Sequence, residues 1–572
     1  MKYWIIDGKD VDITLSDRTE NDIFYVDVKW HSDTPVTPKE FGVRFKIATV
    51  DTYSVFSPSM RGLRSLDRNY FPRITDARLA SWMPLHQLIS LSGENRFCMT
   101  LSDAKIPTRI TSGVRESEAD SEITAYFFTN LTTAITDFSA TIRIDTRAIP
   151  YYDSIYDAIN WWENDCGYTP AFVPELAKTP LNSLWYSYHQ KLEIESIVRE
   201  CKLTKAMGLD VVIVDDGWQT EDGNGGYAYC GDWEPAPKKI GDMKTFINRI
   251  KDTGMKVMIW YSVPYVGIYA KNWERFKDMI LDGTGDKKTY FSLDPRYKEV
   301  RDFLIEIYKN AVTDWDLDGL KLDFIDRFRL EGKSLEPDSR RDTESLEDAV
   351  DILMCAVHDS LYEINPDILL EFRQTYVGPC IRKYGNMLRV TDCPNDSLKN
   401  RTDSINLRLT SGNTAVHSDM LLWHLDDPVE NAALQFVSSV FAVPQISMLI
   451  EELPKDHIEM LKYYISFWKE WKHVLIDGKL TAEHPESNYT LATSTLADKS
   501  VTVVYTDTVA KINTATAVVI NASGKNYVTL KGAKNKQYVI KDCMGNILGN
   551  GKIDTDLTEI SMPLSAQIFI ND

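Results

Sequence analysis

The sequence of 572 residues lacks the signatures of several large protein classes. Its eight cysteines form no C-x-x-C pair and show no close spacing, which indicates free thiols in a reducing compartment. There is no H-E-x-x-H motif, no Walker glycine loop and no G-x-G-x-x-G after a strand-like run. Zincin, nucleotide-hydrolase and dinucleotide-binding functions therefore have no support, and without a G-x-S-x-G elbow neither has the commonest serine-hydrolase arrangement.

Long apolar runs are also missing. No stretch of eighteen apolar residues occurs, and residues 1–10 lack the apolar segment of a signal peptide, so we expect a soluble, cytoplasmic protein. Basic residues are outnumbered, 64 against 84 acidic residues, which gives a formal net charge of −20. This balance argues against nucleic acid and anionic membranes as partners.

The sequence contains three successive regions that differ in their hydrophobic pattern. Up to about residue 148, short alternating runs such as 23–30 and 140–145 predict an N-terminal β-sandwich over residues 1–150. From 476 to 572, runs such as 501–505 are separated by turn residues. They predict a smaller C-terminal antiparallel β-domain, again of the sandwich type.

Between these regions, apolar strand-like runs alternate with segments of helical spacing such as 345–364 and 457–471. The eight runs are 183–188, 211–215, 256–261, 319–324, 368–373, 387–390, 415–419 and 445–450. Eight such βα units predict a (β/α)8 TIM barrel over residues 178–475, preceded by a linker with a helix at 151–177. In this fold the active site lies at the C-terminal ends of the strands.

The fourth run, Gly319-Leu320-Lys321-Leu322-Asp323, holds two charged residues inside an apolar segment. Residues two apart on a strand share a face, so Lys321 and Asp323 are expected to project together, with the cation keeping the carboxylate ionised. A structural ion pair and a carboxylate nucleophile both fit this pattern.

Polar and aromatic residues end several of the other runs. Asp215-Asp216-Gly217-Trp218 follows the second run, Trp260 closes the third, Glu371 and Arg373 close the fifth, and Asp392 follows the sixth. Carboxylates accept hydrogen bonds from sugar hydroxyls, and aromatic faces cover the C–H patches of a sugar ring. The combination indicates a carbohydrate ligand.

These segments, in this order, resemble the signature of glycoside hydrolase family 36, the melibiase-like α-galactosidases. The resemblance rests on Val214–Trp218, Gly231–Trp233, Gly254–Trp260, Lys321–Asp323 and Thr391–Asp396. It implies the three-part architecture predicted above and a retaining exo-α-glycoside hydrolase that uses neither metal nor cofactor. The expected substrate is a terminal α-galactoside, either an oligosaccharide or a small glycoside, and a homo-oligomer is possible in this family.

The resemblance also implies roles for single residues. Asp323 corresponds to the nucleophile and Asp392 to the general acid/base, with Lys321 on the sugar hydroxyls. Asp215 and Asp216 would bind O4 and O6, while Trp260 and Trp185 would wall the pocket. Arg296 resembles the sugar-binding arginine of the family, shifted by one position.

In the expected double displacement, a less polar setting keeps Asp392 protonated, so that it can protonate the leaving group while Asp323 attacks the anomeric carbon. Retention predicts carboxyl groups about 5 to 5.5 Å apart. Asp396, four residues further on, is a rival for the role of Asp392 and otherwise a candidate sugar ligand.

The chain departs from the family pattern at two arginines. Arg373 follows Glu371 where the family has a cysteine and glycines near C2 of the sugar, and Arg389 stands in place of a tryptophan. Either nearby acids neutralise both arginines, or the arginines bind an anionic sugar such as a galacturonide. An α-N-acetylgalactosaminidase, an α-glycosyltransferase and a non-catalytic carbohydrate-binding protein are further alternatives.

Overall fold

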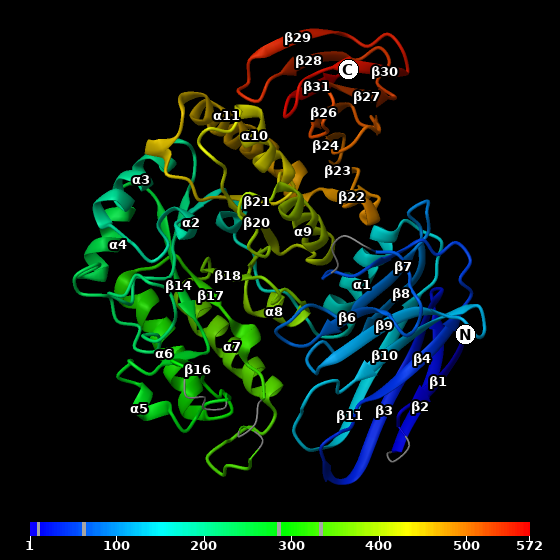
Figure 1. Ribbon diagram of the computed structural model, residues 1–572, viewed down its shortest axis with the longest axis vertical. Helices are drawn as coiled ribbons and strands as arrows, with labels where there is room; N and C mark the ends of the chain where they lie inside the picture. The colour runs from blue at the N-terminus through cyan, green and yellow to red at the C-terminus, as the bar shows by residue number, and fades with distance from the viewer. Residues whose placement is uncertain (9–11, 60–63, 283–287, 331–333, 335) are drawn as a thin grey trace.

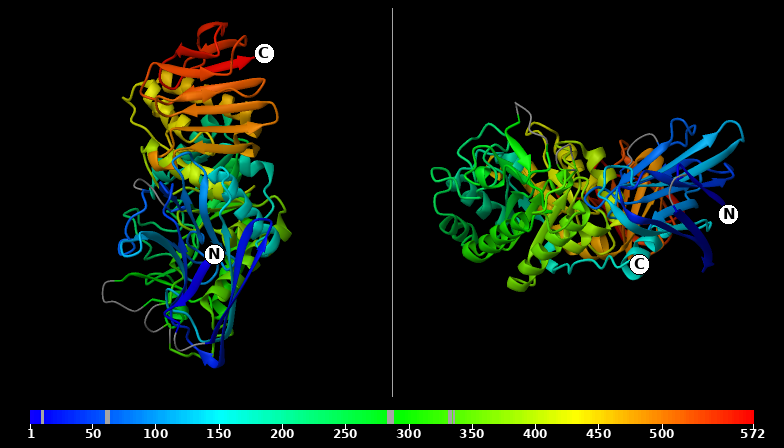
Figure 2. Two further views of the ribbon diagram at one scale, coloured as in Figure 1. Left: turned by 90° about the vertical axis from the view of Figure 1, so that its right-hand side faces the viewer. Right: turned by 90° about the horizontal axis from the view of Figure 1, so that it is seen from below.

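The computed structural model describes residues 1–8, 12–59, 64–282, 288–330, 334 and 336–572. It has the three parts that the sequence predicts (Figure 1). The N-terminal sheets pack beside the barrel, and the C-terminal sheets stand at one end of the molecule, as the turned views confirm (Figure 2). No helix in the described part of the chain has the length and apolarity needed to cross a membrane.

The N-terminal part is a sandwich of two antiparallel sheets. Alternation along β3 places Val26, Val28 and Trp30 in the core while Lys29 and His31 face solvent. One sheet contains β1 (Lys2–Ile6), β4 (Phe41–Ile47), β10 (Asp120–Phe127), β9 (Thr108–Arg115) and β6 (Arg73–Ala77). The other contains β2 (Asp12–Glu20), β3 (Ile23–Val36), β11 (Ile135–Asp145), β8 (Asn95–Leu101), β7 (Leu85–Ile89) and β5 (Ser54–Phe56).

The connecting helix α1 (Tyr151–Asp165) links this sandwich to both other parts. The hydroxyl group of Tyr151 donates a hydrogen bond to the carbonyl of Ala482 (2.9 Å), and that of Tyr156 donates to the carbonyl of Leu480 (2.7 Å). Both carbonyls belong to β22 (Lys479–Glu483), the first strand in the order of the seven-stranded C-terminal sheet. The helix therefore joins the start of the chain to its last domain.

The C-terminal part is a β-domain of a seven-stranded and a three-stranded sheet. The sheets are mostly antiparallel, as predicted, but two strand pairs run parallel. β24 (Lys499–Val504) runs parallel to β26 (Thr516–Asn521), because the chain between them first supplies β25 (Val509–Lys511) to the smaller sheet. β25 is in turn parallel to β27 (Tyr527–Lys531). Such crossovers are what parallel neighbours require.

The middle of the chain forms a closed barrel of eight parallel strands. Helices surround it, among them α3 (Ile194–Ala206), α6 (Lys298–Trp315), α7 (Leu346–Ile364) and α11 (Lys455–Lys472) (Figure 1). The strands are β12 (Leu181–Ser183), β13 (Val211–Val214), β14 (Lys256–Ser262), β17 (Gly319–Asp323), β18 (Leu369–Arg373), β19 (Met387–Arg389), β20 (Ala415–Leu421) and β21 (Val443–Ile446).

Two predicted strands were displaced. The run at 183–188 is a strand only at its first residue, because residues 185–188 form the short helix α2 (Trp185–Tyr188). The run at 445–450 ends at Ile446, and a 3-10 turn begins at Ile450. Both predicted strands continue an apolar or aromatic run beyond the barrel rim. There the tertiary contacts of the loop, rather than strand propensity, determine the backbone conformation.

The barrel interior is apolar at its N-terminal end and polar at its C-terminal end. Leu181, Val211, Ile213, Met258, Leu369, Met387 and Ala415 pack together at the apolar end. Gly319 lies at this level, where a Cβ atom would stand 2.4 Å from the carbonyl oxygen of Leu369. Alternation from Gly319 then carries Lys321 and Asp323 toward the interior at the polar end. The fold therefore gathers charged side chains at the C-terminal rim.

Candidate active site

Asp323 is a deeply buried carboxylate at the rim, with 1% of its surface exposed. Its Oδ2 accepts hydrogen bonds from Trp260 Nε1 (2.8 Å) and Arg373 Nε (2.8 Å), and its Oδ1 accepts one from the hydroxyl group of Tyr376. Burial alone would raise the pKa of Asp323, but the charges of Arg373 and Lys321 hold it below its ordinary value. Asp323 is therefore an ionised group surrounded by donors.

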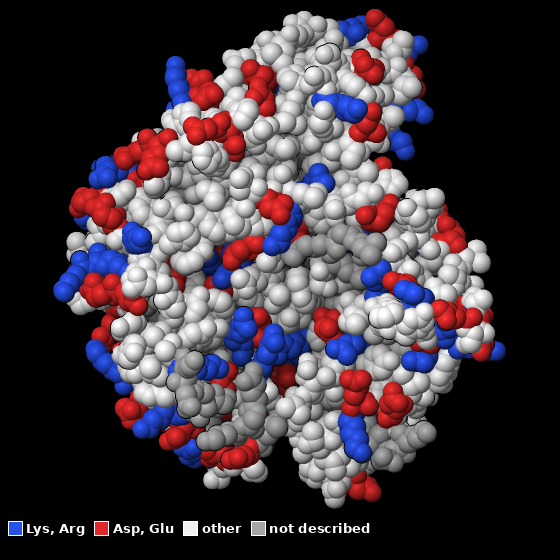
Figure 3. Space-filling view, viewed as in Figure 1, with Lys and Arg blue, Asp and Glu red and all other residues white. Residues whose placement is uncertain are grey.

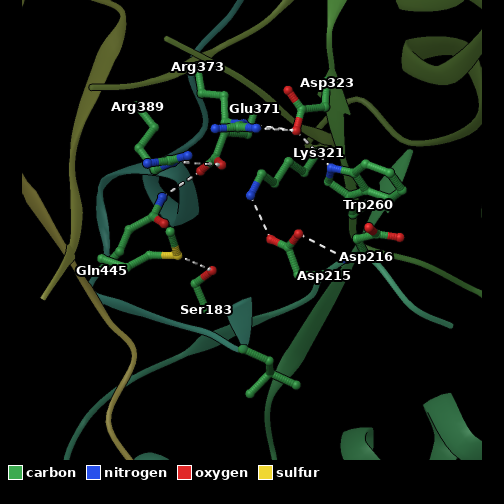
Figure 4. Close-up of polar contacts among 12 residues, drawn as sticks. Ser183, Asp215, Asp216, Trp260, Lys321, Asp323, Glu371, Arg373, Arg389 and Gln445 are labelled. Carbon is green, nitrogen blue, oxygen red and sulfur yellow. Dashed lines mark hydrogen bonds and ion pairs between the residues drawn. The ribbon is translucent and has the colours of Figure 1, made fainter. Parts of the chain in front are cut away.

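Lys321 takes a different partner from the one that the sequence predicts. Its ammonium group donates to Asp215 Oδ2 at 2.6 Å, and the two side chains are almost fully buried (Figure 4). The charge of Lys321 still lowers the pKa of Asp323. The close cation on Asp323 is Arg373 on the next strand, whose Nη2 lies 2.7 Å from Asp323 Oδ2.

The backbone is held in an unusual conformation directly after both of these residues. Phe324 follows Asp323 with φ of 65°, and Gln374 follows Arg373 with φ of 58°. Left-handed conformations cost a non-glycine residue about 1 to 3 kcal/mol and gather at functional sites. The strain lies where β17 and β18 end, so it fixes how Asp323 and Arg373 enter the site.

Arg373 also binds Asp392, which follows β19. Its Nη1 lies 2.9 Å from both carboxylate oxygens of Asp392, and Arg389 Nη2 lies 2.7 Å from Oδ1. Burial raises the pKa of Asp392, but the charges of Arg389 and Arg373 lower it far below its ordinary value. The less polar setting predicted for Asp392 was therefore wrong: the structure surrounds it with two cations and holds it ionised.

The second arginine connects Asp392 to a carboxylate that the sequence analysis did not assign. Arg389 is fully buried, and its Nη1 binds Asp419 within β20. Asp419 also accepts from the backbone amide of Cys393 (2.6 Å) and the hydroxyl group of Tyr186 (2.9 Å). The strand-like run 415–419, which ends at this aspartate, could have identified it in the sequence.

His417 and Glu371 lie deeper in the barrel. His417 Nε2 lies 2.8 Å from the carbonyl oxygen of Ala177, and burial lowers the histidine pKa to about 4, as befits a hydrogen-bonded core histidine. Glu371 accepts from Gln445 Nε2 at 2.5 Å, and its carboxylate is 3.9 Å from Arg389 (Figure 4). Burial raises the pKa of Glu371.

The adjacent aspartates after β13 have separate environments. Asp215 pairs with Lys321, whereas Asp216 accepts from Gln190 Nε2 and Gln219 Nε2, each at 2.7 Å. Burial raises the pKa of Asp216 to about 6. Gly217 follows with φ of 118°, and a Cβ atom there would stand 2.6 Å from the Cα atom of Gln190. A glycine is thus required for the turn that presents both aspartates.

Aromatic rings form one wall of this region. Trp260 is 1% exposed, and the ring of Tyr227 lies parallel to it with centroids 6.2 Å apart. Phe324 meets Trp260 edge to face. Trp185 is half-buried and its ring meets His189 at 5.0 Å, so Trp185 belongs to the rim rather than to the ring cluster around Trp260.

Two predicted site residues are engaged elsewhere. Arg296 is 1% exposed and is held by Asp294 (2.7 Å) and the carbonyl of Ser334 (2.7 Å), outside the described contacts of the rim carboxylates. Asp396 is exposed and accepts from the backbone amide of Lys399 (2.9 Å), which makes it the N-cap of α9 (Ser397–Thr410). Asp396 is therefore a capping residue rather than a partner of Asp323.

Three cations and six acids make up the described cluster. The cations are Lys321, Arg373 and Arg389, and the acids are Asp215, Asp216, Asp323, Glu371, Asp392 and Asp419. Among the described residues no group of histidine, cysteine, aspartate or glutamate side chains is arranged to hold a metal ion. Outside the site, both signs of charge intermingle over the described face shown in Figure 3.

Part of the chain is similar in sequence to known proteins. Residues 177–393 match the model of the melibiase family, a segment that includes Asp323 and Asp392. The bifunctional α-galactosidase/sucrose kinase AgaSK of Mediterraneibacter gnavus is 26% identical over 146 residues, which span 24% of this chain and 15% of that protein.

Solved structures show a similar fold over nearly the whole chain. A variant of the family 36 α-galactosidase AgaA of Geobacillus stearothermophilus, in complex with raffinose, superposes with a TM-score of 0.69 at 13% identity, covering 98% of this chain and 81% of that one. The galactosidase domain of AgaSK superposes with a TM-score of 0.66 at 14% identity, covering 99% of this chain and 81% of that one.

A barrel with buried carboxylates, a lysine and tryptophans at its C-terminal rim, flanked by two β-domains, is the architecture that this chain shares with these α-galactosidase structures. Over residues 177–393 the chain matches the melibiase family, and its fold is similar to those of family 36 α-galactosidases.

Proposed function

We propose that the protein hydrolyses terminal α-galactosides with retention of configuration and that Asp323 is the nucleophile. The observation that carries this proposal is the state of Asp323, an ionised carboxylate at the end of β17 whose position is fixed by Trp260, Arg373 and Tyr376. A weakly basic carboxylate with a fixed orientation can attack an anomeric carbon and later leave it.

Asp392 is the proposed partner of Asp323. One guanidinium group, that of Arg373, contacts both carboxylates and so holds the two acids near each other. As an ionised group, Asp392 is ready to deprotonate the water that attacks the glycosyl-enzyme in the second step.

Other residues would bind the sugar. Asp215 and Asp216 present carboxylate oxygens from the turn after β13, and Lys321 reaches the same place from β17. These groups suit the hydroxyls of a neutral sugar, because carboxylates accept and an ammonium donates. Trp260, whose indole nitrogen donates to Asp323, lies beside the reacting centre.

The position of the two arginines favours galactose over galacturonic acid. Arg373 and Arg389 already bind Asp323, Asp392 and Asp419 within hydrogen-bond distance. A substrate carboxylate would have to displace a protein carboxylate from a cluster in which acids outnumber cations. The first of the two readings of these arginines, neutralisation by nearby acids, is therefore the one that we propose.

The test is hydrolysis of aryl α-glycosides of galactose, N-acetylgalactosamine, galacturonic acid and glucose by the wild type and by Asp323→Ala. We expect the galactoside to be cleaved and the variant to be inactive. Azide added to Asp323→Ala should give β-galactosyl azide, because a small anion replaces the missing nucleophile from the same side. Wild-type activity that survives in Asp323→Ala, or a first product of inverted anomeric configuration, would refute the proposal.

A further inference from the structure

Residues 78–82 of the N-terminal part form a tight turn that is anchored in the sandwich and packed against the barrel. The turn lies between β6 of one sheet and β7 of the other. The backbone amides of Arg78 and Ser81 each donate to the carbonyl of the other residue at 2.9 Å, and the amide of Leu79 donates to the carbonyl of Lys105 in the sandwich (2.9 Å). Leu79 is buried in the same apolar core as the residues of the barrel.

Arg78 holds the loop that follows the strand of the proposed nucleophile. Its Nη2 donates to the carbonyl of Asp326, and its Nη1 lies 3.5 Å from the carbonyl of Phe328. These carbonyls belong to the 3-10 turn η2 (Ile325–Arg327) and to the residue after it. Arg329 also donates to the carbonyl of Asp326 (3.0 Å), but it belongs to this loop and is half-exposed. Of the two arginines, Arg78 is the one that ties the loop to the sandwich.

The main chain of Trp82 holds the loop after the next strand, β18. Its backbone amide donates to the carbonyl of Thr375 at 2.6 Å. Gly378 precedes α8 (Pro379–Tyr384), and a Cβ atom at this glycine would stand 2.3 Å from the carbonyl oxygen of Trp82. The turn after β6 and the start of α8 therefore meet closely at the boundary between the two parts (Figure 1). One turn of the sandwich thus binds two consecutive loops of the barrel rim.

The two loops carry groups that bind the nucleophile. Tyr376 donates its hydroxyl group to Asp323 Oδ1, and the backbone amide of Phe324 donates to the same oxygen at 2.8 Å. Both loops are also strained, and so is the turn: φ is 65° at Phe324, 58° at Gln374 and 57° at Trp82. Non-glycine residues keep such conformations only where the surrounding structure over-determines them. The turn supplies contacts of this kind to both loops.

We propose that residues 78–82 are a positioning segment of the active site, which fixes Asp323 and Tyr376 by holding the loops that follow β17 and β18. The site is then complete only when the sandwich is docked on the barrel. This inference rests on the proposed function, which supplies the nucleophile. A displacement of about 1 Å costs a catalytic group about 10²-fold in rate. The proposed sugar ligands Asp215 and Lys321 hold each other, so affinity for the sugar should not depend on the turn.

The first test removes the guanidinium group. In Arg78→Ala, kcat/KM for 4-nitrophenyl α-galactoside should fall about 10- to 10²-fold, while the inhibition constant of galactose stays within threefold of the wild-type value. Arg329→Ala is the matched control, because it removes a donor to the same carbonyl but no link to the sandwich. Equal losses in the two variants, or a loss explained by weaker galactose binding, would overturn this inference alone. A wild type that cleaves no α-galactoside would overturn the proposed function as well.

A cavity beside Arg78 allows a chemical rescue of this variant. The cavity measures about 390 Å³, and both parts of the protein line it, with Asn130 from the sandwich and Leu330 and Glu347 from the barrel. The carboxyl group of Glu347 favours a cation there. Millimolar methylguanidinium should therefore raise kcat/KM of Arg78→Ala at least threefold and leave Arg329→Ala unchanged. A further loss of activity in Arg78→Ala would show a general weakening of the fold and contradict the inference, because guanidinium salts denature proteins.

A second variant disturbs the other contact and does not depend on Arg78. Gly378 has φ of −78°, which alanine adopts freely, so Gly378→Ala acts through its close approach to the carbonyl of Trp82. We expect kcat/KM to fall at least tenfold with the inhibition constant of galactose unchanged. Gly549→Ala is the control, since nothing lies within 4 Å of a Cβ atom at that position. Equal kcat/KM in these two variants, with equal far-ultraviolet circular dichroism, would overturn the role of the turn.

Discussion

Lys321 donates its hydrogen bond to Asp215, 2.6 Å away on another strand, and not to Asp323, two residues along its own. Both members of the pair are almost fully buried. A buried carboxylate that loses its only cation is left with an uncompensated charge, which costs far more than the pair itself contributes. The lysine is therefore a structural partner of the aspartate as well as a proposed sugar ligand.

Replacing this lysine should harm both stability and affinity. Lys321→Met keeps the length of the side chain but removes its charge, so we expect a loss of about 3 to 5 kcal/mol in the free energy of unfolding at neutral pH. The double variant Lys321→Met with Asp215→Asn should recover part of that loss, because no unpaired carboxylate remains. Urea unfolding of the two variants measures the difference, and equal stabilities would contradict the pairing.

Arg373 should set the acid limit of activity. Its charge lowers the pKa of Asp323, which must be ionised to attack, so kcat/KM falls as the pH drops through that pKa. In Arg373→Gln the acid limb of the pH profile of kcat/KM should move to higher pH by about one unit or more. Arg329→Gln, a half-exposed arginine outside the cluster, is the control. An unmoved limb in Arg373→Gln would show that another group controls the nucleophile.

A pair of single substitutions tests which of Asp392 and Asp396 has the catalytic role. Asp392→Asn should lower kcat for phenyl α-galactoside by about 10² to 10⁴-fold, through loss of the base of the second step. Asp396→Ala removes the N-cap of α9 and should cost about 1 kcal/mol of stability while activity persists. The reverse pattern, with activity lost only at Asp396, would return Asp396 to the catalytic role.

Glu200 gives the fold a dependence on pH. It lies on α3, is 2% exposed and accepts from the backbone amide of Ile450, and burial raises its pKa to about 7. Because the folded pKa exceeds the unfolded value, the contribution of Glu200 to stability is complete below pH 4.5 and is lost as the pH rises to about 7.

The variant Glu200→Gln keeps an acceptor for Ile450 but carries no charge. Between pH 5 and pH 8 its stability should therefore gain about 2 kcal/mol relative to the wild type. Thermal unfolding at both values tests this expectation, with Glu451→Gln as a half-exposed neighbouring control. A difference between variant and wild type that does not change with pH would show that Glu200 is ionised in the folded state throughout.

Strand periodicity predicted the barrel, its order and most of its strand bounds, because buried parallel strands are short apolar runs. The same periodicity correctly placed Lys321 and Asp323 on the inner face. It could not show that Lys321 would pair with Asp215, since partners on neighbouring strands depend on register and side-chain direction.

The electrostatic environment of Asp392 could not be predicted from the sequence either. Its two arginines were recognised as unusual, but only the register that pairs Arg373 with Arg389 on β18 and β19 brings both guanidinium groups to one carboxylate. Asp396 and Arg296 show a related difficulty: a helix cap and a buried ion pair use the same residue types as a sugar site. Local sequence does not distinguish these uses.

The hydrogen bonds from Tyr151 and Tyr156 to the carbonyls of β22 have a consequence for handling the protein. A strand that ends a sheet offers an open ladder to which another chain can add. Here two tyrosines of α1 donate hydrogen bonds to two carbonyl groups of β22 and so cover part of its edge. Proteolysis within the linker at 166–180 would loosen this cover without cutting the sheet itself. Samples nicked there should polymerise on storage, whereas intact chains stay dispersed.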